Sequence, residues 1–148
     1  MAGEIYTDAQ DEKLIQSILL YGFNMPQKQV PKWTVLRIAL AKSLQMPSPP
    51  DDSLDQFENQ GSTYRLEQVT GLGQISNESG NRDFTDVICA LLSVFHHENL
   101  FNDEKRFYQL LQRHIRRGLQ EIRLKWHSED DFYAYFYHTL FVNKNLLK

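Results

Sequence analysis

The stretch Pro31–Pro50 reads PKWTVLRIALAKSLQMPSPP and predicts one helix with well-marked ends. Proline fits the first turn of a helix, where its missing N–H needs no partner, whereas the prolines after Met46 cannot continue one. We therefore expect a helix from Pro31 to about Gln45. Its charged residues are all basic, namely Lys32, Arg37 and Lys42. The helix is thus either an ordinary amphipathic element or one that lies against a negatively charged partner.

Four more helices are expected from apolar residues spaced three and four apart. The first runs from Asp8 to about Tyr21, with Thr7 and Gln10 at the spacing of a capping box. The others cover Arg82 to His97, the stretch after Asn102 that ends near Trp126, and an aromatic helix that follows Ser128. Residues 51–80 are rich in turn-forming residues, and we expect loops there with a short strand or a small hairpin.

This pattern predicts a mainly α, compact, single-domain bundle of about five helices. We expect residues 7–126 to form the domain and residues 127–148 to form an aromatic helical extension packed on it. The predicted core residues are Trp33, Leu36, Leu91, Phe95, Phe107, Leu111 and Gly118. The glycine is expected to let a neighbouring helix approach closely.

Composition places the chain among ordinary globular proteins. It has 148 residues, 41% apolar and 24% charged, with a net charge of -3. Any attraction to nucleic acid must therefore come from a local patch. The single cysteine, Cys89, cannot form an intrachain disulfide, which favours a reducing compartment. Since the N-terminus lacks the features of a secretory signal and no apolar run is long enough for a membrane span, we expect a cytoplasmic protein.

Basic residues are segregated from acids along the chain. The segment Lys105 to Lys125 contains one acid, Glu121. On a helical wheel, the arginines of this segment lie opposite its apolar face. Guanidinium groups bind phosphate oxygens in a bidentate manner. The residues predicted to contact a DNA backbone are Lys28, Lys32, Arg37, Lys42, Arg113, Arg116, Arg117 and Arg123. The alternative is a solvated helix face, or basic residues that pair with the protein's own acids.

No arrangement of residues points to catalysis, a metal or a cofactor. His96, His97 and Glu98 are adjacent on a predicted helix, so their side chains do not converge on one ion. His114 lies on an apolar helix face, where a hydrogen-bonded core or interface histidine is expected. Cys89 lies in an apolar helix and is expected to be buried. We predict a protein that is not an enzyme and has no cofactor or metal site.

The C-terminal stretch FYAYFYHTLF carries aromatic residues on every face of its predicted helix. Such a helix is either central to a core or covered by a partner. The residues predicted to form an interface are Phe132, Tyr135, Phe136 and Leu140. A plain core helix is the alternative.

Two blocks of the sequence resemble the DndE family, small proteins of the DNA phosphorothioate modification machinery. The first is a tryptophan-containing helix before a proline-rich break, and its matching residues are Trp33, Val35, Leu36, Ala39, Ser43, Leu44, Pro47, Pro49 and Pro50. The matching residues of the second block are Phe107, His114, Arg117, Gly118 and Leu119. The resemblance covers about residues 8–122, in the same order as in the family.

The resemblance implies a largely helical protein without a cofactor that self-associates, binds duplex DNA with a preference for nicks, and acts beside sulphur-incorporating enzymes. We therefore predict a non-enzymatic accessory subunit of a DNA phosphorothioate modification complex or a related anti-phage, restriction–modification system. Family members carry a basic run before the tryptophan helix, where this chain has only Lys28 and Lys32. The alternative function is a protein-interaction or oligomerisation module, for example attached to an ATPase or a nuclease, without its own affinity for DNA.

Overall fold

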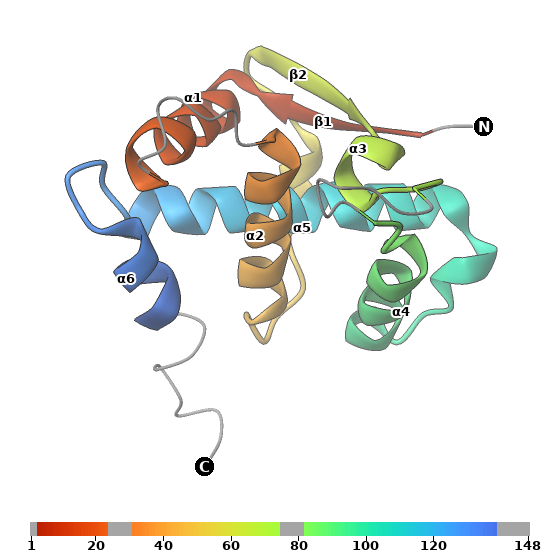
Figure 1. Cartoon of the computed structure of the whole chain (residues 1–148). Helices are drawn as coiled ribbons and strands as arrows, with labels where there is room; N and C mark the ends of the chain where they lie inside the picture. The colour runs from red at the N-terminus through yellow and green to blue at the C-terminus, as the bar shows by residue number, and fades with distance from the viewer. Residues whose placement is uncertain (1–2, 24–30, 75–81, 139–148) are drawn as a thin grey trace.

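The longest helix, α5 (Glu104–Lys125), runs behind the other helices, and α1, α2, α4 and the first strand contact it (Figure 1). The computed structural model describes residues 3–23, 31–74 and 82–138. Within these residues the fold is mainly α, with one small sheet, as the sequence predicts. Helix α5 has a broad apolar face that is buried by its neighbours, which is why the fold forms around it.

Helix α2 (Lys32–Leu44) crosses α5 at very short range. Gly118 of α5 faces the backbone of Ala39, and a methyl group added at the glycine would lie 2.8 Å from the Ala39 Cα and closer still to its carbonyl group. The expectation that Gly118 lets a neighbouring helix approach closely is thus confirmed. Val35, Leu36 and Ala39 are fully buried in this crossing.

The sheet joins two segments that are far apart in sequence. Strand β1 (Glu4–Asp8) pairs antiparallel with β2 (Gln60–Arg65), and Ile5 lies opposite Tyr64. The strand predicted within residues 51–80 is therefore present, but its partner is the N-terminus and not a second strand of a local hairpin. A strand of five residues gives too short an alternating pattern to be recognised alone.

Three further predicted helices are present close to their predicted positions, namely α1 (Ala9–Ser17), which a π-helical turn η1 (Ile18–Gly22) continues, α4 (Thr85–His96) and α6 (Phe132–Tyr137). Three elements were not predicted, namely the 3₁₀ turns η2 (Asp52–Asp55) and η3 (Leu100–Asn102) and the short helix α3 (Leu66–Thr70), which lies where loops or strands were expected. Aspartates cap three of the helices. Asp8 caps α1, one residue after the Thr7 of the predicted capping box, Asp103 caps α5 and Asp131 caps α6.

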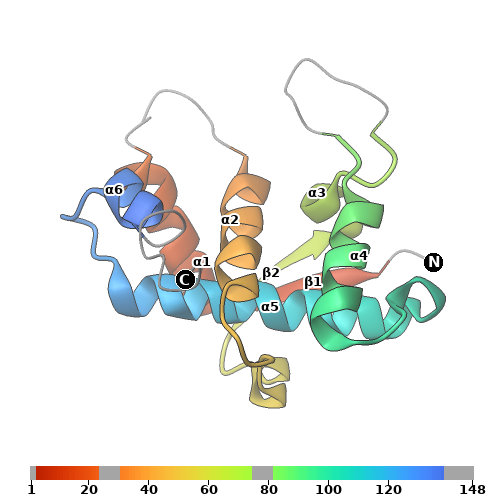
Figure 2. The ribbon, with the colours of Figure 1, turned by 90° about the horizontal axis from the view of Figure 1, so that it is seen from below.

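Seen from below, α1, α2 and α4 stand on one side of α5, and the turn η2 lies on the other side (Figure 2). Helix α4 and helix α6 lie near opposite ends of α5, with α2 between them. Because α5 is covered from both sides, side chains on several of its faces meet protein instead of solvent.

Candidate functional site

Arg116, at the centre of the predicted DNA-binding face, lies inside the protein. It is 4% exposed, and its guanidinium pairs with the carboxylates of Asp8 at 2.7 Å and Asp11 at 2.9 Å. Its Nη1 also donates to the carbonyl oxygens of Leu54 and Gln56. Arg116 therefore links α5 to the start of α1 and to the end of η2. The prediction that this side chain faces outward is wrong, because η2 and α1 cover that side of α5.

Arg117 is also buried, at 8% exposure, and it binds the end of α2. Its Nε donates to Ser43 Oγ at 2.8 Å, its Nη2 to the Ser43 carbonyl at 2.7 Å and its Nη1 to the Ser48 carbonyl at 2.5 Å. No carboxylate pairs with it among the described residues. The carbonyl oxygens at a helix C-terminus carry partial negative charge. Arg117 thus caps the C-terminus of α2. The prediction that it faces solvent is wrong.

Ser43, His114 and His96 extend this network as a hydrogen-bonded chain, in which Ser43 and His114 are buried and His96 is half-buried. Ser43 Oγ lies 2.8 Å from His114 Nδ1, and His114 Nε2 lies 2.8 Å from His96 Nε2. The tautomer of His114 sets which atom donates in each of these two bonds, while Arg117 donates to the same serine oxygen. Burial, with His96 and Arg117 nearby, lowers the pKa of His114 to about 3. The expected hydrogen-bonded core histidine is therefore present.

Two further predicted cations are paired with the protein's own acids. Arg113 binds Asp55 of η2 through two nitrogens, at 2.9 and 2.6 Å, and this hydrogen bonding lowers the pKa of Asp55. Lys32 lies 3.0 Å from Glu12 of α1. Burial alone would raise the pKa of Glu12, but hydrogen bonds from its neighbours, Lys32 among them, lower it. The alternative in which basic residues pair internally thus describes these positions.

Arg37 is engaged by its surroundings as well. Its Nε donates to the Val69 carbonyl at 2.7 Å, and its guanidinium lies 4.1 Å from the centre of the Trp33 ring. Phe84 covers it further, at 5.4 Å from the ring centre. Arg37 therefore joins α2 to α3 and to the start of α4.

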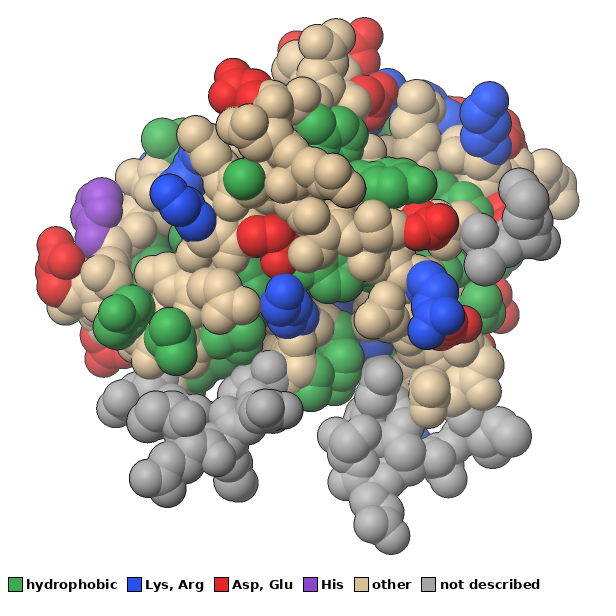
Figure 3. Space-filling model, turned by 90° about the horizontal axis from the view of Figure 1, so that it is seen from above, with side chains coloured by type: hydrophobic (Ala, Val, Ile, Leu, Met, Phe, Trp, Pro, Cys, Tyr) green, Lys and Arg blue, Asp and Glu red, His purple; other side chains and the backbone are tan. Residues whose placement is uncertain are grey.

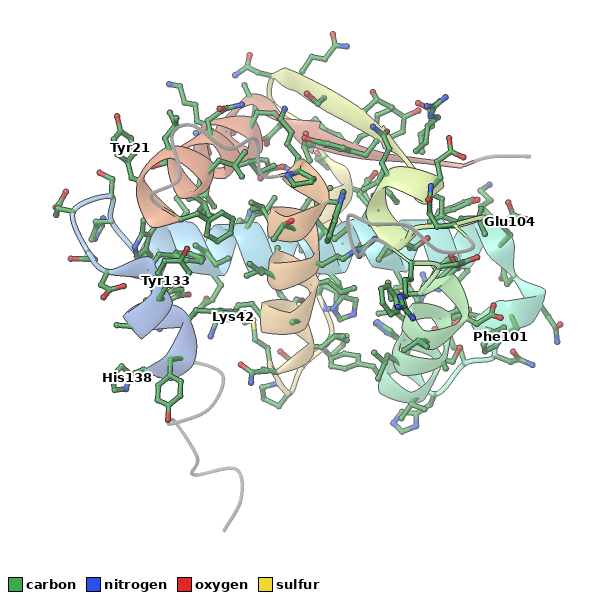
Figure 4. The ribbon with its side chains drawn as sticks, viewed as in Figure 1. Tyr21, Lys42, Phe101, Glu104, Tyr133 and His138 are labelled. Carbon is green, nitrogen blue, oxygen red and sulfur yellow. The ribbon has the colours of Figure 1, made fainter. Side chains whose placement is uncertain are left out.

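Arg123 and Lys42 form no ion pair within the described residues, and Lys28 lies outside these residues. Arg123 is exposed and contacts the side chain of Gln10. Lys42 is half-buried on the side of α2 that faces α6 (Figure 4). Burial lowers the pKa of Lys42, with Lys125 adding to the effect and Glu121 opposing it. On the face shown in Figure 3, basic and acidic side chains are interspersed and no broad basic field is visible.

The predicted aromatic interface is largely part of the core. Phe132 is 2% exposed and packs edge-on against Phe23 and Trp126, at 5.6 and 5.1 Å between ring centres. Its assignment to an interface is wrong, because the chain turns after Trp126 and brings the ring back onto η1 and α5. Tyr135 and Phe136 are partly buried against the same core, and Leu140 lies outside the described residues.

Three exposed apolar side chains lie on α4, more than on any other helix in the described residues, although the sequence predicted core there. Val87 is 57% exposed, Leu91 50% and Val94 75%. The predicted burial of Leu91 is wrong because α4 is apolar on most of its circumference, and Ile88, Cys89 and Leu92 are the residues it turns inward. Trp33 and Phe95 are half-buried, and the predicted core residues that are buried are Leu36, Phe107, Leu111 and Gly118.

Within the described ranges 3–23, 31–74 and 82–138, no group of three or more potential metal ligands occurs. No helix in these ranges has the length and apolar character needed to cross a bilayer. Cys89 is buried, as expected, and is a free thiol.

Comparison with known proteins identifies one family. The model of the family described as DNA sulphur modification protein DndE matches residues 23–130, which is more than half of the chain. The match runs from before α2 to the loop before α6. It therefore includes the two buried arginines, Arg116 and Arg117. No curated protein and no solved structure gives a significant match.

Proposed function

The chain belongs to the DndE family of DNA sulphur modification proteins, and we propose that it serves this modification as a non-enzymatic accessory subunit that acts through protein contacts. The observation that carries the proposal is the exposed apolar face of α4. Exposed apolar patches of this kind mark interaction sites in soluble proteins. The proposed setting is a phosphorothioate modification complex in the cytoplasm, of the kind used in anti-phage restriction–modification.

The buried arginines support protein contact over DNA contact as the main role. Arg116 and Arg117 have most of their N–H groups bonded to protein oxygens, and Arg113 and Lys32 are paired with acids. A cation that already satisfies a buried carboxylate gains little from a phosphate, since it would first have to leave that partner unpaired. Electrostatic attraction to a DNA backbone therefore rests on fewer residues than the sequence indicates.

DNA-backbone binding is the second candidate function, and Lys42 with Lys125 favours it. The two ammonium groups repel each other, and Glu121 is the acid that faces both, with its carboxylate 3.3 Å from Lys125 Nζ. A phosphate placed between them would relieve this repulsion. Arg123, two residues before Lys125 on α5, adds an exposed charge.

A deletion strain complemented with the gene tests the proposed role. Loss of phosphorothioate linkages from genomic DNA on deletion, with recovery on complementation, is the expected result when digested DNA is analysed by mass spectrometry. Unchanged phosphorothioate content after deletion refutes the proposal.

Fluorescence anisotropy with plain and nicked duplexes tests the second candidate. Binding that weakens steeply between low and moderate salt, and that a Lys42→Glu/Lys125→Glu variant loses, supports backbone contact. Absence of binding at low salt excludes it. Light scattering of the same samples tests self-association, which the family resemblance implies.

A further inference from the structure

A pocket of about 460 Å³ lies where α3, α4, η3 and the first turns of α5 meet. This volume is within the range of about 300–1,000 Å³ that is typical of ligand sites. None of the residues predicted to bind DNA or to form the aromatic interface lines this pocket. The lining combines an apolar floor, three aromatic rings and two carboxylates, and these features together indicate what it can bind.

The floor of the pocket is apolar, and its rim is open to solvent. Leu66, Cys89 and Leu100 are buried lining residues. Leu72 and Phe101 line it as well, and they are 41% and 55% exposed. Sites for small ligands usually enclose most of the ligand surface. An open rim above a buried apolar floor is therefore better suited to a side chain that reaches in from a larger molecule.

Both carboxylates of the lining lack an ion-pair partner. Asp86 lies in the first turn of α4, and Glu104 is the first residue of α5. Both are exposed, and neither pairs with a lysine or arginine among the described residues. The basic residues closest to them in sequence, Arg82 and Lys105, do not line the pocket. The helix dipoles favour acids at these positions but supply no counter-ion, so the pocket is complementary to a cation.

Aromatic rings accompany these acids. Phe101, Phe107 and Tyr108 line the pocket, and the Tyr108 hydroxyl donates a hydrogen bond to Glu104, which holds that carboxylate beside a ring. Phe101 and Glu104 lie at the same end of the molecule, where α5 begins (Figure 4). A planar guanidinium stacks on aromatic rings and also binds carboxylates through paired hydrogen bonds, whereas an ammonium group is a more strongly hydrated point charge. Among basic side chains, arginine therefore fits this lining best.

We propose that this pocket binds an arginine side chain of another protein. The apolar stem of the arginine lies on the floor, and its guanidinium contacts Asp86, Glu104 and Phe101. The proposal rests on the proposed function, since it names the kind of residue by which a partner of this accessory subunit is held. Arginine is one of the residues that most often dominate the binding energy of protein interfaces.

NMR spectroscopy of the full chain with labelled leucine methyl groups tests the chemistry of the pocket. The probes are a peptide with one arginine between pairs of alanines and the same peptide with citrulline, the neutral isostere of arginine. We expect saturable shifts of the Leu72 and Leu100 methyl groups with the arginine peptide, and binding about tenfold weaker with citrulline. The methyl groups of Leu124, an exposed leucine of α5 outside the pocket, should not shift.

Two variants separate the pocket from general charge effects. Asp86→Asn/Glu104→Gln should weaken binding of the arginine peptide about tenfold. The matched control Glu58→Gln/Glu129→Gln removes the same charge at exposed sites outside the pocket and should leave binding unchanged. Equal binding of the two peptides, an equal loss in both variants, or no shift at millimolar arginine peptide overturns the proposal.

Photo-crosslinking in the native host identifies the source of the arginine. Phe101 is replaced by p-benzoylphenylalanine, and in a matched control Tyr133, an exposed aromatic residue of α6, is replaced in the same way. We expect an adduct from position 101, absent at position 133, with an arginine-containing segment of another polypeptide. An adduct with a second copy of this chain, or no adduct, overturns the proposal. Neither measurement reads phosphorothioate content, so both can fail while the deletion strain still confirms the proposed function.

Discussion

Replacement of Arg116 by methionine gives the sharpest test of the assignment of this arginine to the interior. The change keeps most of the side-chain volume and removes the charge. It leaves Asp11, which is itself buried, without its cation and removes the 2.7 Å pair with Asp8. Breaking one side of a buried ion pair costs about 3–5 kcal/mol. With a urea m-value of about 2 kcal/mol/M, the unfolding midpoint should fall by about 2 M.

The assay is urea unfolding followed by circular dichroism at 222 nm, with Arg123→Met as the matched control. Arg123 lies on the same helix but is exposed, so its replacement should change stability by no more than about 0.5 kcal/mol. Asp11→Asn combined with Arg116→Met removes the stranded charge and should restore at least about 1 kcal/mol. A loss below about 1 kcal/mol for Arg116→Met would refute the reasoning.

The pH dependence of this variant has a definite sign. Burial raises the pKa of Asp11, although the hydrogen bond from Arg116 opposes it. Without Arg116 the folded-state pKa rises further above the unfolded value, so the folded protein takes up a proton more readily as the pH falls. The penalty of Arg116→Met should therefore be largest near pH 7 and shrink toward pH 5. A penalty that is independent of pH would contradict the stranded-carboxylate explanation.

Three further variants test the packing of the fold. Gly118→Ala pushes a methyl group into the α2 backbone and should cost at least about 3 kcal/mol in urea unfolding, whereas Gln120→Ala, at an exposed site of the same helix, should be neutral. Phe132→Ala should cost about 3–5 kcal/mol without changing the mass seen by light scattering, and Tyr133→Ala, at an exposed position, should cost far less. Since the folded pKa of His114 lies below its unfolded value, stability should fall by about 2 kcal/mol between pH 7 and pH 5, and His114→Gln should remove most of this loss.

The helices and the closest helix crossing could be predicted because local signals define them. Prolines flank α2, and the apolar period of α5 is long and regular. Gly118 was predicted to allow close approach because a glycine on the apolar face of a long helix otherwise weakens it. The N-terminal strand could not be predicted, since its partner lies some 55 residues away and no local pattern specifies that pairing.

The candidate site was mispredicted where a helical wheel cannot show which neighbours cover a face. Arg116 and Arg117 lie opposite the apolar stripe in sequence, yet η2 and the end of α2 cover them. Helix α4 poses the reverse problem, because both of its sides are apolar and periodicity alone cannot choose between them. The spacing of Val87, Leu91 and Val94 was a usable signal for a second contact face.

Phosphorothioate content in a complemented deletion strain tests the central claim most directly, namely that this subunit works through α4 and not through its basic residues. The two variants to compare are Leu91→Glu/Val94→Glu on the exposed face of α4 and Lys42→Glu/Lys125→Glu at the lysine pair of the second candidate function. Circular dichroism must first show that both are folded. The account predicts that the first variant abolishes modification and that the second retains it. Modification that persists in the first and is lost in the second would contradict the account.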